Sequence, residues 1–574
     1  MKRLLIIKTF FIILIFVFGI VTVAADSPSG LRIVHNIEEP EPEPDLPADV
    51  DYDFPSLAQT SYGWTDFEAL VESGVYDDAR VIFVSESGND STGAIYDISD
   101  IEFDTDGMFQ AVGSINPYRT IAAAYQQIRD GYPDILLFNR GDEWTESIPG
   151  YVKSGRGFYA RHIIASYGSG DRPQFFETMI NARDSSYLII SGLRLYTNNW
   201  ETSGRAIEIT GDVNHQLYED LKVDEHYNNK VQGGTDGVSN VAFRRCIFTD
   251  HSAHDGVFYA ARVTGLLYEG NVFYRPREPS DPDRYGRHLY LSPSGSGDDK
   301  HALVGVILRG NIFALGERES VDVRSGGVVD NNLFLQNDLL SIGGRGGSAD
   351  SLQAVAVTNN VHLEGSPNTN DTNQLNLINI YGGLVSGNIW TDPTNVGSGA
   401  NAISIMGSET VFVAKNITIR DNLIYGYQGS GSARGLQISS NLEEVENITI
   451  SSNEFQYVTG SSNIILHRDW QEDRFEGFTY RNNKYYSTSS ESDWFIPGDT
   501  LNGWIRESGE TGAESGRISY PYPDRTIKTY NDSLGGTAST EAFIEEVLNQ
   551  SRYNWRPAYT AAGANNYIRA GFGK

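Results

Sequence analysis

An asparagine-centred repeat constrains the fold of this 574-residue chain more than any other feature. The repeat is a small or polar residue, then asparagine, any residue, and an aromatic or apolar residue. Its asparagines lie 21 to 40 residues apart: Asn271, Asn311, Asn332, Asn360, Asn388, Asn422, Asn453 and Asn483. Repeats of this length are typical of stacked supersecondary units. Because asparagine tolerates left-handed backbone and can hydrogen-bond to its copy in the next unit, the repeat predicts a β-solenoid with an asparagine ladder.

Hydrophobicity with a period of two indicates short strands within the central repeats. Between Gly286 and Gly347 the alternating segments are separated by Gly, Ser, Asn and Asp turns. The predicted strands are His288–Ser292, Gly305–Leu308, Ser320–Arg324, Val328–Asn331 and Leu339–Ile342. Cys246, the sole cysteine, stands where asparagine recurs elsewhere. It is therefore predicted to be a buried structural thiol, and an internal disulfide is excluded.

The same alternation assigns side chains to the two faces of each strand. In the first of these strands two leucines face inward, which leaves His288 and Tyr290 on the solvent face. In the third, two valines face inward and leave Asp322 and Arg324 outside. Aligning the inward pairs of successive coils predicts one outward column: Glu208, Phe258, Tyr290, Asp322, Ser341, Asn379, Ser404 and Gln437.

Charge marks the same region. The formal net charge of −31 argues against a nucleic-acid partner, because phosphate binding needs a basic surface. Between Arg284 and Arg345, however, seven Lys or Arg side chains balance seven Asp or Glu. Arginine is the natural partner of a sugar carboxylate or sulfate, so this segment predicts a site for an acidic sugar. Four of the ten histidines lie in or near it: His251, His254, His288 and His301.

Three N-terminal segments resemble secreted right-handed parallel β-helix proteins, the pectin-lyase-like superfamily. The strand, helix and apolar strand within Val81–Ser91 and Pro117–Trp144 resemble the opening of these proteins, and Ile163–Pro173 resembles the next turn. The resemblance extends over roughly residues 81–486. It implies an all-β fold, a single-stranded right-handed parallel β-helix (β-solenoid) with short helical caps.

The segment GNIF…VDVRSGGVVDNNLF resembles the arginine-bearing coils of the β-helical alginate and chondroitin B lyases. It implies a polysaccharide lyase that cleaves a uronate-containing chain by β-elimination. This chemistry needs a cation that neutralises the sugar carboxylate, a base that removes the C5 proton and an acid that protonates the leaving oxygen. In that family a lysine about one coil before the arginine is the base, and here that place holds Lys300, His301 and Leu303. We expect catalysis by His288, Tyr290, His301 and Arg324, and substrate binding by His254, Lys300, Arg309, Asp322 and Arg345.

Alternatives stay open at this point. A glycoside hydrolase would use a carboxylate pair, and an epimerase or a non-catalytic glycan-binding protein would use the same surface. Arg324 could instead pair structurally with Asp322, and Tyr290 could simply stack over Phe258. No metal ligand is assigned. Calcium stays open as a cofactor through loop acids: Asp281, Asp283, Asp298 and Asp299.

The ends of the chain predict export. Two basic residues, an apolar segment and small residues over 1–25 are typical of a secretory signal peptide, with an uncleaved signal anchor as the alternative. The other predicted units are an acidic Pro-rich disordered linker (26–55), an N-terminal helical cap (56–80), the β-helix (81–486) and a C-terminal loop and helix cap (487–574). We expect a secreted monomer, extracellular or periplasmic, with an acidic polysaccharide as partner and no membrane insertion after signal cleavage.

Overall fold

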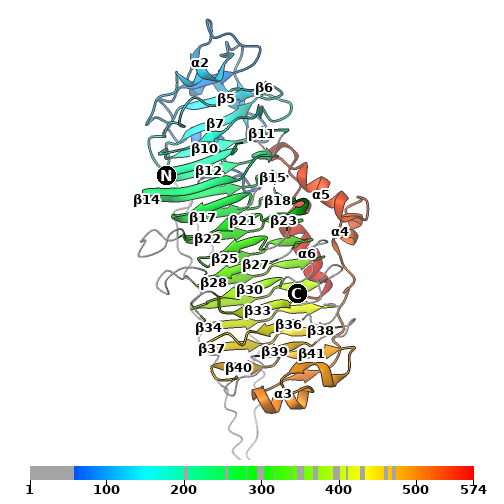
Figure 1. Ribbon diagram of the computed structural model, residues 1–574. Coiled ribbons are helices and arrows are strands. Elements are labelled where there is room, and N and C mark those ends of the chain that lie inside the picture. The colour runs from blue at the N-terminus through cyan, green and yellow to red at the C-terminus, as the bar shows by residue number, and fades with distance from the viewer. Residues whose placement is uncertain are drawn as a thin grey trace, which may run out of the picture. The chain divides into compact units, whose positions relative to one another are not determined.

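The computed structural model describes residues 57–198, 204–251, 256–278, 281–293, 303–316, 319–337, 339–344, 354–365, 373–391, 401–408, 412–426, 434–457, 463–467 and 474–574. The predicted signal peptide and acidic linker lie outside these residues. The described residues belong to one compact unit within Pro44–Lys574. Its strands stack coil upon coil, from β5 near one end to β40 near the other (Figure 1).

Each coil contributes strands to three sheets, which we call first, second and third in their order along the coil. The first sheet contains β16 (Phe258–Ala261), β21 (Leu289–Leu291), β24 (Val321–Val323), β27 (Leu340–Gly343), β30 (Leu375–Ile378), β33 (Asn401–Met406), β36 (Arg434–Ile438), β39 (Ile465–His467) and β42 (Phe495–Ile496). Upstream, β9 (Ile180–Asn181) and the first halves of β12 (Ile207–Glu219) and β14 (Asn229–Arg244) extend it.

The second sheet contains β1 (Val81–Val84), β5 (Ile135–Asn139), β7 (His162–Tyr167), β10 (Leu188–Ser191), the second halves of β12 and β14, β17 (Val263–Glu269), β22 (Val304–Arg309), β25 (Gly327–Asp330), β28 (Val355–Thr358), β31 (Gly383–Ser386), β34 (Val413–Arg420), β37 (Glu444–Ser451) and β40 (Phe478–Arg481).

The third sheet contains β6 (Glu143–Trp144), β8 (Gln174–Phe176), β11 (Arg194–Tyr196), β13 (Lys222–Asp224), β15 (Ile247–Thr249), β18 (Val272–Tyr274), β23 (Ile312–Ala314), β26 (Leu333–Leu335), β29 (Val361–Leu363), β32 (Ile389–Thr391), β35 (Leu423–Tyr425), β38 (Glu454–Tyr457), β41 (Lys484–Ser487) and β43 (Glu514–Ser515).

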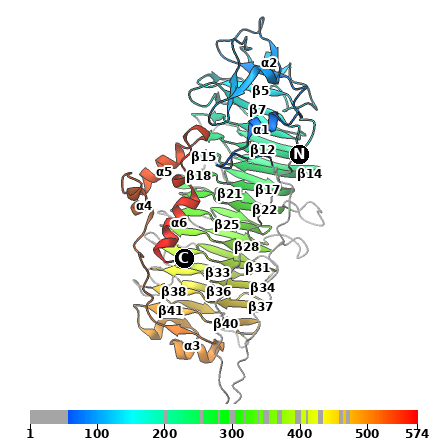
Figure 2. The same cartoon turned by 180° about the vertical axis from the view of Figure 1, so that it is seen from behind.

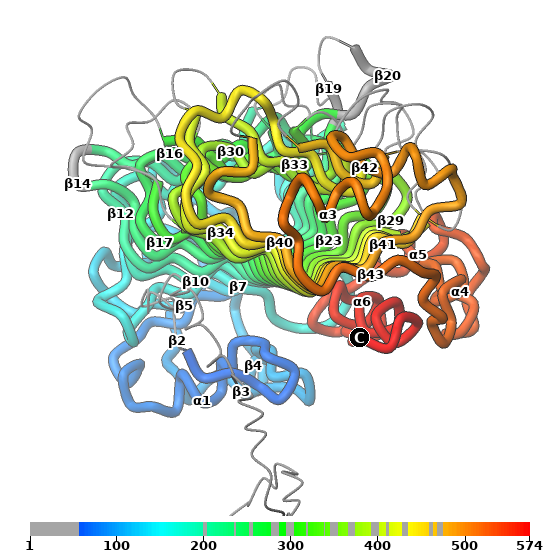
Figure 3. The backbone as a smooth tube through the Cα atoms, turned by 90° about the horizontal axis from the view of Figure 1, so that it is seen from below, coloured from blue at the N-terminus to red at the C-terminus, as the bar shows by residue number. Residues whose placement is uncertain are grey.

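Strands of successive coils pair in parallel throughout these three sheets. Antiparallel pairs occur as additions: β2 (Ile95–Tyr96) with β1, β3 (Ile101–Phe103) with β4 (Phe109–Ala111), and β19 (Arg277–Glu278) with β20 (Asp281–Tyr285). The view along the stack shows the coils superimposed around a common interior (Figure 3). The all-β parallel β-helix is therefore confirmed, and its right-handed coiling stays a prediction.

The asparagine ladder is present as the repeat predicts. In the coil of Asn360, the Oδ1 atom accepts hydrogen bonds from the backbone N–H of Asn332 (2.9 Å) and from its Nδ2 (3.0 Å). The Nδ2 of Asn360 donates to Val329 O (2.8 Å) and to Asn388 Oδ1 (3.0 Å). The same pattern repeats from Asn271 to Asn483, so over this part of the stack each bend between the second and third sheets is joined to the next.

Different residues end the ladder. The backbone N–H of Cys246 donates to Asn271 Oδ1 (2.9 Å), and its buried thiol has a pKa raised by burial, which agrees with the predicted structural role. At the other end Glu510 Oε1 accepts from Asn483 N (3.2 Å) and Nδ2 (2.8 Å). Its Oε2 accepts from the Tyr485 hydroxyl (2.8 Å) and from Trp504 Nε1 (2.7 Å). Glu510 thus supplies the acceptors that a further asparagine would have supplied.

Short helices cover the ends and sides of the stack (Figures 1 and 2). The six α-helices of the described residues are α1 (Phe67–Val71), α2 (Ile121–Tyr125), α3 (Leu501–Ser508), α4 (Ile527–Ser533), α5 (Thr540–Leu548) and α6 (Ala561–Gly571). Helix α2 contacts β1 and α3 contacts β42, near opposite ends. Helices α4–α6 bury apolar side chains against outward residues of the third sheet, and Asn565 on α6 donates to Asn331 Oδ1 (2.9 Å).

Candidate functional site

The outer face of the first sheet carries the predicted column of mainly polar side chains. Strand register defines its members: Glu208, Lys230, Tyr259, Tyr290, Asp322, Ser341, Asn376, Ser404 and Gln437. The predicted column was wrong at two positions. Phe258 is fully buried inside and aligns with Leu289, while Asn379 follows β30. Prediction also missed Lys230, which lies between Glu208 and Tyr259 in the column.

Tyr290 lies at the centre of the cationic part of this column. Its ring centroid is 4.7 Å from the Arg324 guanidinium carbon and 5.2 Å from that of Arg287. On the neighbouring coil the Tyr259 ring lies 5.8 Å away, at 37° to it. Because Tyr259 and Tyr290 are both partly exposed, the two rings and two guanidinium groups form a surface that a flat polar ligand can contact. Tyr290 therefore stacks beside Tyr259, and the predicted partner Phe258 was wrong.

Carboxylates hold both arginines in place. Arg324 Nε donates to Asp322 Oδ2 at 2.9 Å, and Arg287 Nη2 to Glu319 Oε2 at 2.5 Å. The Asp322 side chain is only 1% exposed, although its strand position points it outward as predicted. The pairing of Arg324 with Asp322 was one of the alternatives left open by the sequence. It fixes the guanidinium group beside Tyr290, and 19% of the Arg324 side chain remains exposed.

His288 does not lie on the solvent face, and that prediction was wrong. It precedes β21, in the bend where the chain enters the first sheet, so the strand alternation does not extend to it. Its ring is fully buried, with Nδ1 2.7 Å from Ser320 Oγ and Nε2 3.1 Å from Ala314 O. Burial lowers the pKa of His288 to about 3. A neutral imidazole enclosed in this way cannot reach a polysaccharide, so we no longer assign it a catalytic role.

The remaining predicted residues divide into two groups. Arg309 ends β22 in the second sheet, where it aligns with Glu269 and Asp330 and is exposed. It belongs to a different sheet from Tyr290, so it is not brought into the column. The other four lie outside the described residues: His254, Lys300, His301 and Arg345.

No three His, Cys, Asp or Glu side chains within the described ranges gather closely enough to hold a metal ion. The loop acids suggested for calcium lie in or next to segments whose side chains are outside the description. Among the described helices, none is long and apolar enough to cross a membrane.

Strand topology defines this chain as a parallel β-helix protein. No protein-family model matches the sequence, and no curated protein matches it either. Solved structures with detectable similarity include a mannuronic acid specific polysaccharide family 6 lyase from human gut microbiota, with 15% identity, coverage of 77% of this chain and 94% of that one, and a TM-score of 0.43. A lacto-N-biosidase from Eubacterium ramulus has 12% identity, 76% and 68% coverage and a TM-score of 0.32. A rhamnogalacturonan lyase has 12% identity, 73% and 84% coverage and a TM-score of 0.29.

Proposed function

We propose that this protein is a secreted carbohydrate-active enzyme that cleaves a uronate-containing polysaccharide by β-elimination at the Tyr290 column. The observation that carries the proposal is the placement of the Tyr290 ring between the guanidinium groups of Arg287 and Arg324 on an accessible sheet face. The partly exposed members Lys230, Tyr259 and Tyr290 lie on three successive coils about 4.8 Å apart, so a short stretch of an extended polymer can lie along them. Farther along the column Ser341, Asn376 and Ser404 are buried.

Binding a polyanionic substrate requires local cations, because the net negative charge of the whole chain repels it. The formal net charge is −31, and its field repels an acidic polysaccharide at long range. At the column Arg287, Arg324 and Lys230 balance Glu319, Asp322 and Glu208, so this part of the surface is neutral in a strongly acidic chain. The carboxylates fix the two guanidinium groups rather than removing them from the surface. A substrate carboxylate would therefore be attracted to this part of the solenoid, where arginine can contact it through two parallel hydrogen bonds.

The elimination assigns a separate task to each group. Arg324, assisted by Arg287, neutralises the uronate carboxylate, which makes the adjacent C5–H bond more acidic. A base removes the C5 proton, the C4–O bond breaks with its electrons moving to oxygen, and a C4=C5 double bond forms. The partly exposed column offers Tyr290, Tyr259 and Lys230 as proton-transfer groups, and we assign Tyr290 and Lys230 to the two transfers, one at C5 and one at the leaving oxygen.

Product analysis tests this function directly. The full chain is incubated with alginate, pectate, glycosaminoglycans and sulfated algal glycans, and both ultraviolet absorbance and new reducing ends are recorded. A lyase yields both signals in step, because each cleavage creates an unsaturated uronate. Reducing ends without absorbance would instead identify a hydrolase, and binding without either signal would identify a glycan-binding protein.

Arg324 provides the sharpest mutational test. Arg324→Ala is expected to lower kcat/KM by about 100-fold, the usual effect of losing one preorganised donor. Arg324→Lys should recover little of this, since an ammonium group cannot form the two-bonded contact. Because Arg324 also bonds to buried Asp322, thermal denaturation of each variant is measured alongside.

Arg420→Ala is the matched control, because Arg420 ends β34 in the second sheet, away from the column. Its kcat/KM should stay within twofold of the parent. If Arg324→Ala retains full turnover while remaining folded, the chemistry lies elsewhere on the solenoid.

A further inference from the structure

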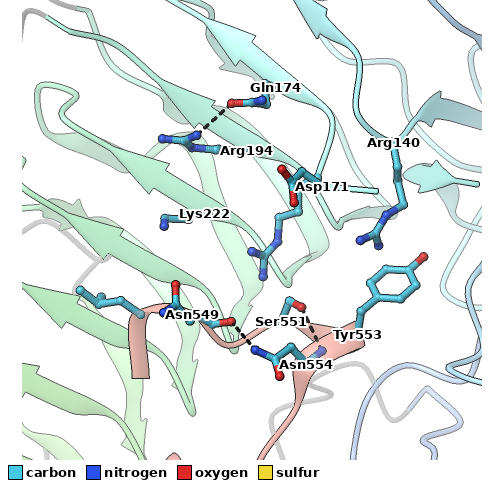
Figure 4. Close-up of a pocket in the computed structure, with 11 residues that line it drawn as sticks. Arg140, Asp171, Gln174, Arg194, Lys222, Asn549, Ser551, Tyr553 and Asn554 are labelled. Carbon is cyan, nitrogen blue, oxygen red and sulfur yellow. Dashed lines mark hydrogen bonds between the residues drawn. The ribbon is translucent and has the colours of Figure 1, made fainter. Parts of the chain in front are cut away.

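A cavity of about 380 Å³ lies on the outer side of the third sheet, between its first coils and the segment that follows α5 (Figure 4). Strands β8, β11 and β13 provide one wall through Gln174, Arg194 and Lys222, which share one register position. Residues 548–554 provide the opposite wall. Its volume falls within the range of about 300–1,000 Å³ that is typical of small-molecule sites.

The same register position changes character along the third sheet. In the coils below the cavity it is occupied by Ile247, Val272 and Ile312, whose side chains are buried beneath the C-terminal helices. In the cavity coils it is occupied by an amide and two cations, although the C-terminal segment still covers them. Apolar side chains at this position would have extended the apolar interface with the C-terminal segment. Partly burying Gln174, Arg194 and Lys222 there costs desolvation free energy, which favours a role other than packing.

Cations dominate the wall. Arg140, Arg172, Arg194 and Lys222 line the cavity, with Asp171 as the acid among the lining residues. Arg172 and Arg194 are each paired, with Asp220 at 2.5 Å and with Asp224 at 2.8 Å. Counting these three acids against four cations leaves a net charge of +1 in a chain whose total is −31.

Two of these cations have no carboxylate partner among the described residues. Arg140 donates to the Gly170 carbonyl oxygen and its guanidinium group lies 3.3 Å from the centre of the Tyr553 ring. Lys222 forms neither a hydrogen bond nor an ion pair through its ammonium group within the part of the chain that the structure describes. Burial lowers the pKa of Lys222, and the neighbouring Arg194 and Arg172 lower it further against the opposing effect of Asp224. An anion bound beside Lys222 would favour the charged ammonium group and so oppose the lowering of its pKa by burial and by the two arginines.

Neutral hydrogen-bonding groups complete the site. Gln174 accepts a hydrogen bond from Arg194 Nη1 (2.9 Å), and its amide group remains at the cavity wall. Asn549 and Ser551 line the opposite side. The covering segment is fixed in place, because Arg172 donates to Gln550 O (3.0 Å) and the Arg552 N–H donates to Asp220 Oδ1 (3.1 Å). The cavity is therefore a formed site with cations on the strand side and amide and hydroxyl groups on the other.

We propose that this cavity binds the carboxylate or sulfate group of an acidic sugar, with Lys222 and Arg140 as the anion-binding residues. The cations face an oxyanion, and Gln174, Asn549 and Ser551 face the hydroxyl groups of the ring that carries it. The site is separate from the Tyr290 column, since it lies on the third sheet and the column lies on the first. It binds its ligand whether or not the column is catalytic.

Ligand-dependent thermal denaturation tests the site. Sodium glucuronate, sodium sulfate and glucose are titrated into the full chain carrying Arg324→Ala, at constant ionic strength maintained with sodium chloride. A ligand that binds only the folded state stabilises it by RT ln(1 + [L]/Kd), so the denaturation midpoint rises with the logarithm of the ligand concentration once this exceeds Kd. We expect glucuronate to raise the midpoint, sulfate to raise it less, and glucose to leave it unchanged.

Substitutions locate the effect. Lys222→Gln should weaken the binding of glucuronate at least tenfold. Lys222→Arg should bind glucuronate with an affinity close to that of the parent, because the positive charge is kept. Lys484→Gln is the matched control, a partly exposed lysine of the same sheet outside the cavity, and should bind like the parent. Equal glucuronate binding by the parent and Lys222→Gln would overturn the site. Sulfate binding without glucuronate binding would exclude the carboxylate, and glucose 6-sulfate is then titrated in the same way. If glucose 6-sulfate leaves the midpoint unchanged, the sugar is overturned and the ligand is a free inorganic anion.

Discussion

Single residues of this protein show how burial decides the role of a histidine. His288 and His362 are both enclosed, and burial lowers the pKa of each to about 3. His362 belongs to a ladder of stacked rings inside the third sheet, between Phe334 (4.4 Å between ring centroids) and Trp390 (5.0 Å). Neither of its ring nitrogens has a hydrogen-bond partner among the described residues. It occupies the place of a phenylalanine while carrying the desolvation cost of two polar atoms.

Replacing that ring is therefore expected to stabilise the protein. His362→Phe removes two unsatisfied polar atoms and keeps the stack, so the free energy of unfolding should rise by about 1–3 kcal/mol. Urea denaturation at pH 7 measures the change. His467→Phe is the contrasting control. The two ring nitrogens of His467 lie 2.7 Å from the Tyr480 hydroxyl and 2.6 Å from Arg474 O, so replacing this ring should lower the free energy of unfolding. A lower midpoint for His362→Phe would contradict this account.

At the scale of elements, the asparagine ladder and its ends hold successive coils in register. Glu510 accepts four hydrogen bonds while being only 3% exposed, and burial raises the pKa of its carboxyl group. Glu510→Gln would place an amide N–H₂ group against either the Asn483 donors or the Tyr485 and Trp504 donors. We expect a loss of about 1–3 kcal/mol in the free energy of unfolding, because buried donors lose their acceptor.

Glu514→Gln provides the comparison for that substitution, since Glu514 lies on exposed β43 close to Glu510 in sequence. Its urea midpoint should match the parent. If Glu510→Gln also matches the parent, the carboxylate is not needed to end the ladder.

The ladder could be predicted from sequence because a single residue type recurs at one backbone position. The column was harder to predict. Around Phe258 five consecutive apolar or aromatic residues follow one another (257–261), so alternation does not show which of Phe258 and Tyr259 points inward. Two asparagines, Asn376 and Asn379, similarly fit either phase of β30. His288 lies in a bend, where a strand rule does not apply.

At the scale of the whole molecule, the cavity on the third sheet could not be predicted from sequence at all. Its walls come from residues 140–222 and from 548–554, and no local pattern relates these segments. The cationic residues of the first wall are separated along the chain, so they do not form a basic run that composition would reveal. Only the packing of the C-terminal segment against the third sheet brings them opposite Asn549 and Tyr553.

Acid should destabilise the molecule through its buried histidines. Burial lowers the pKa of each below the unfolded value of about 6.5: to about 4 for His162, His226 and His251, and to about 3 for His288 and His362. Between pH 6.5 and these values the unfolded chain binds more protons than the native one, so stability is lost as pH falls through this window. Each group contributes a slope of up to about 1.4 kcal/mol per pH unit.

Urea denaturation at pH 7, 6 and 5 measures this dependence. The midpoint should fall at each step, although the raised pKa of Glu510 opposes the trend at the acidic end. His362→Phe should show a shallower decline than the parent, since one proton fewer is taken up on unfolding. A midpoint that is constant from pH 7 to pH 5 would contradict the assignment of these histidines as neutral in the folded protein.

The regular spacing of part of the ladder has a consequence for how such a chain can change length. Asn332, Asn360 and Asn388 follow one another at intervals of 28 residues, and the ladder bonds of each join it to the asparagine before it and to the one after it. Duplicating or deleting one such interval would leave every remaining asparagine with an equivalent partner, while the stack would grow or shrink by about 4.8 Å. Helix α6 is anchored on both sides of this interval, because Asn565 donates to Asn331 Oδ1 and Arg569 donates to Gly387 O (2.6 Å). A copied coil between these two anchors would separate them, so we expect descendants of this protein to gain or lose coils only where the ladder lies clear of that helix.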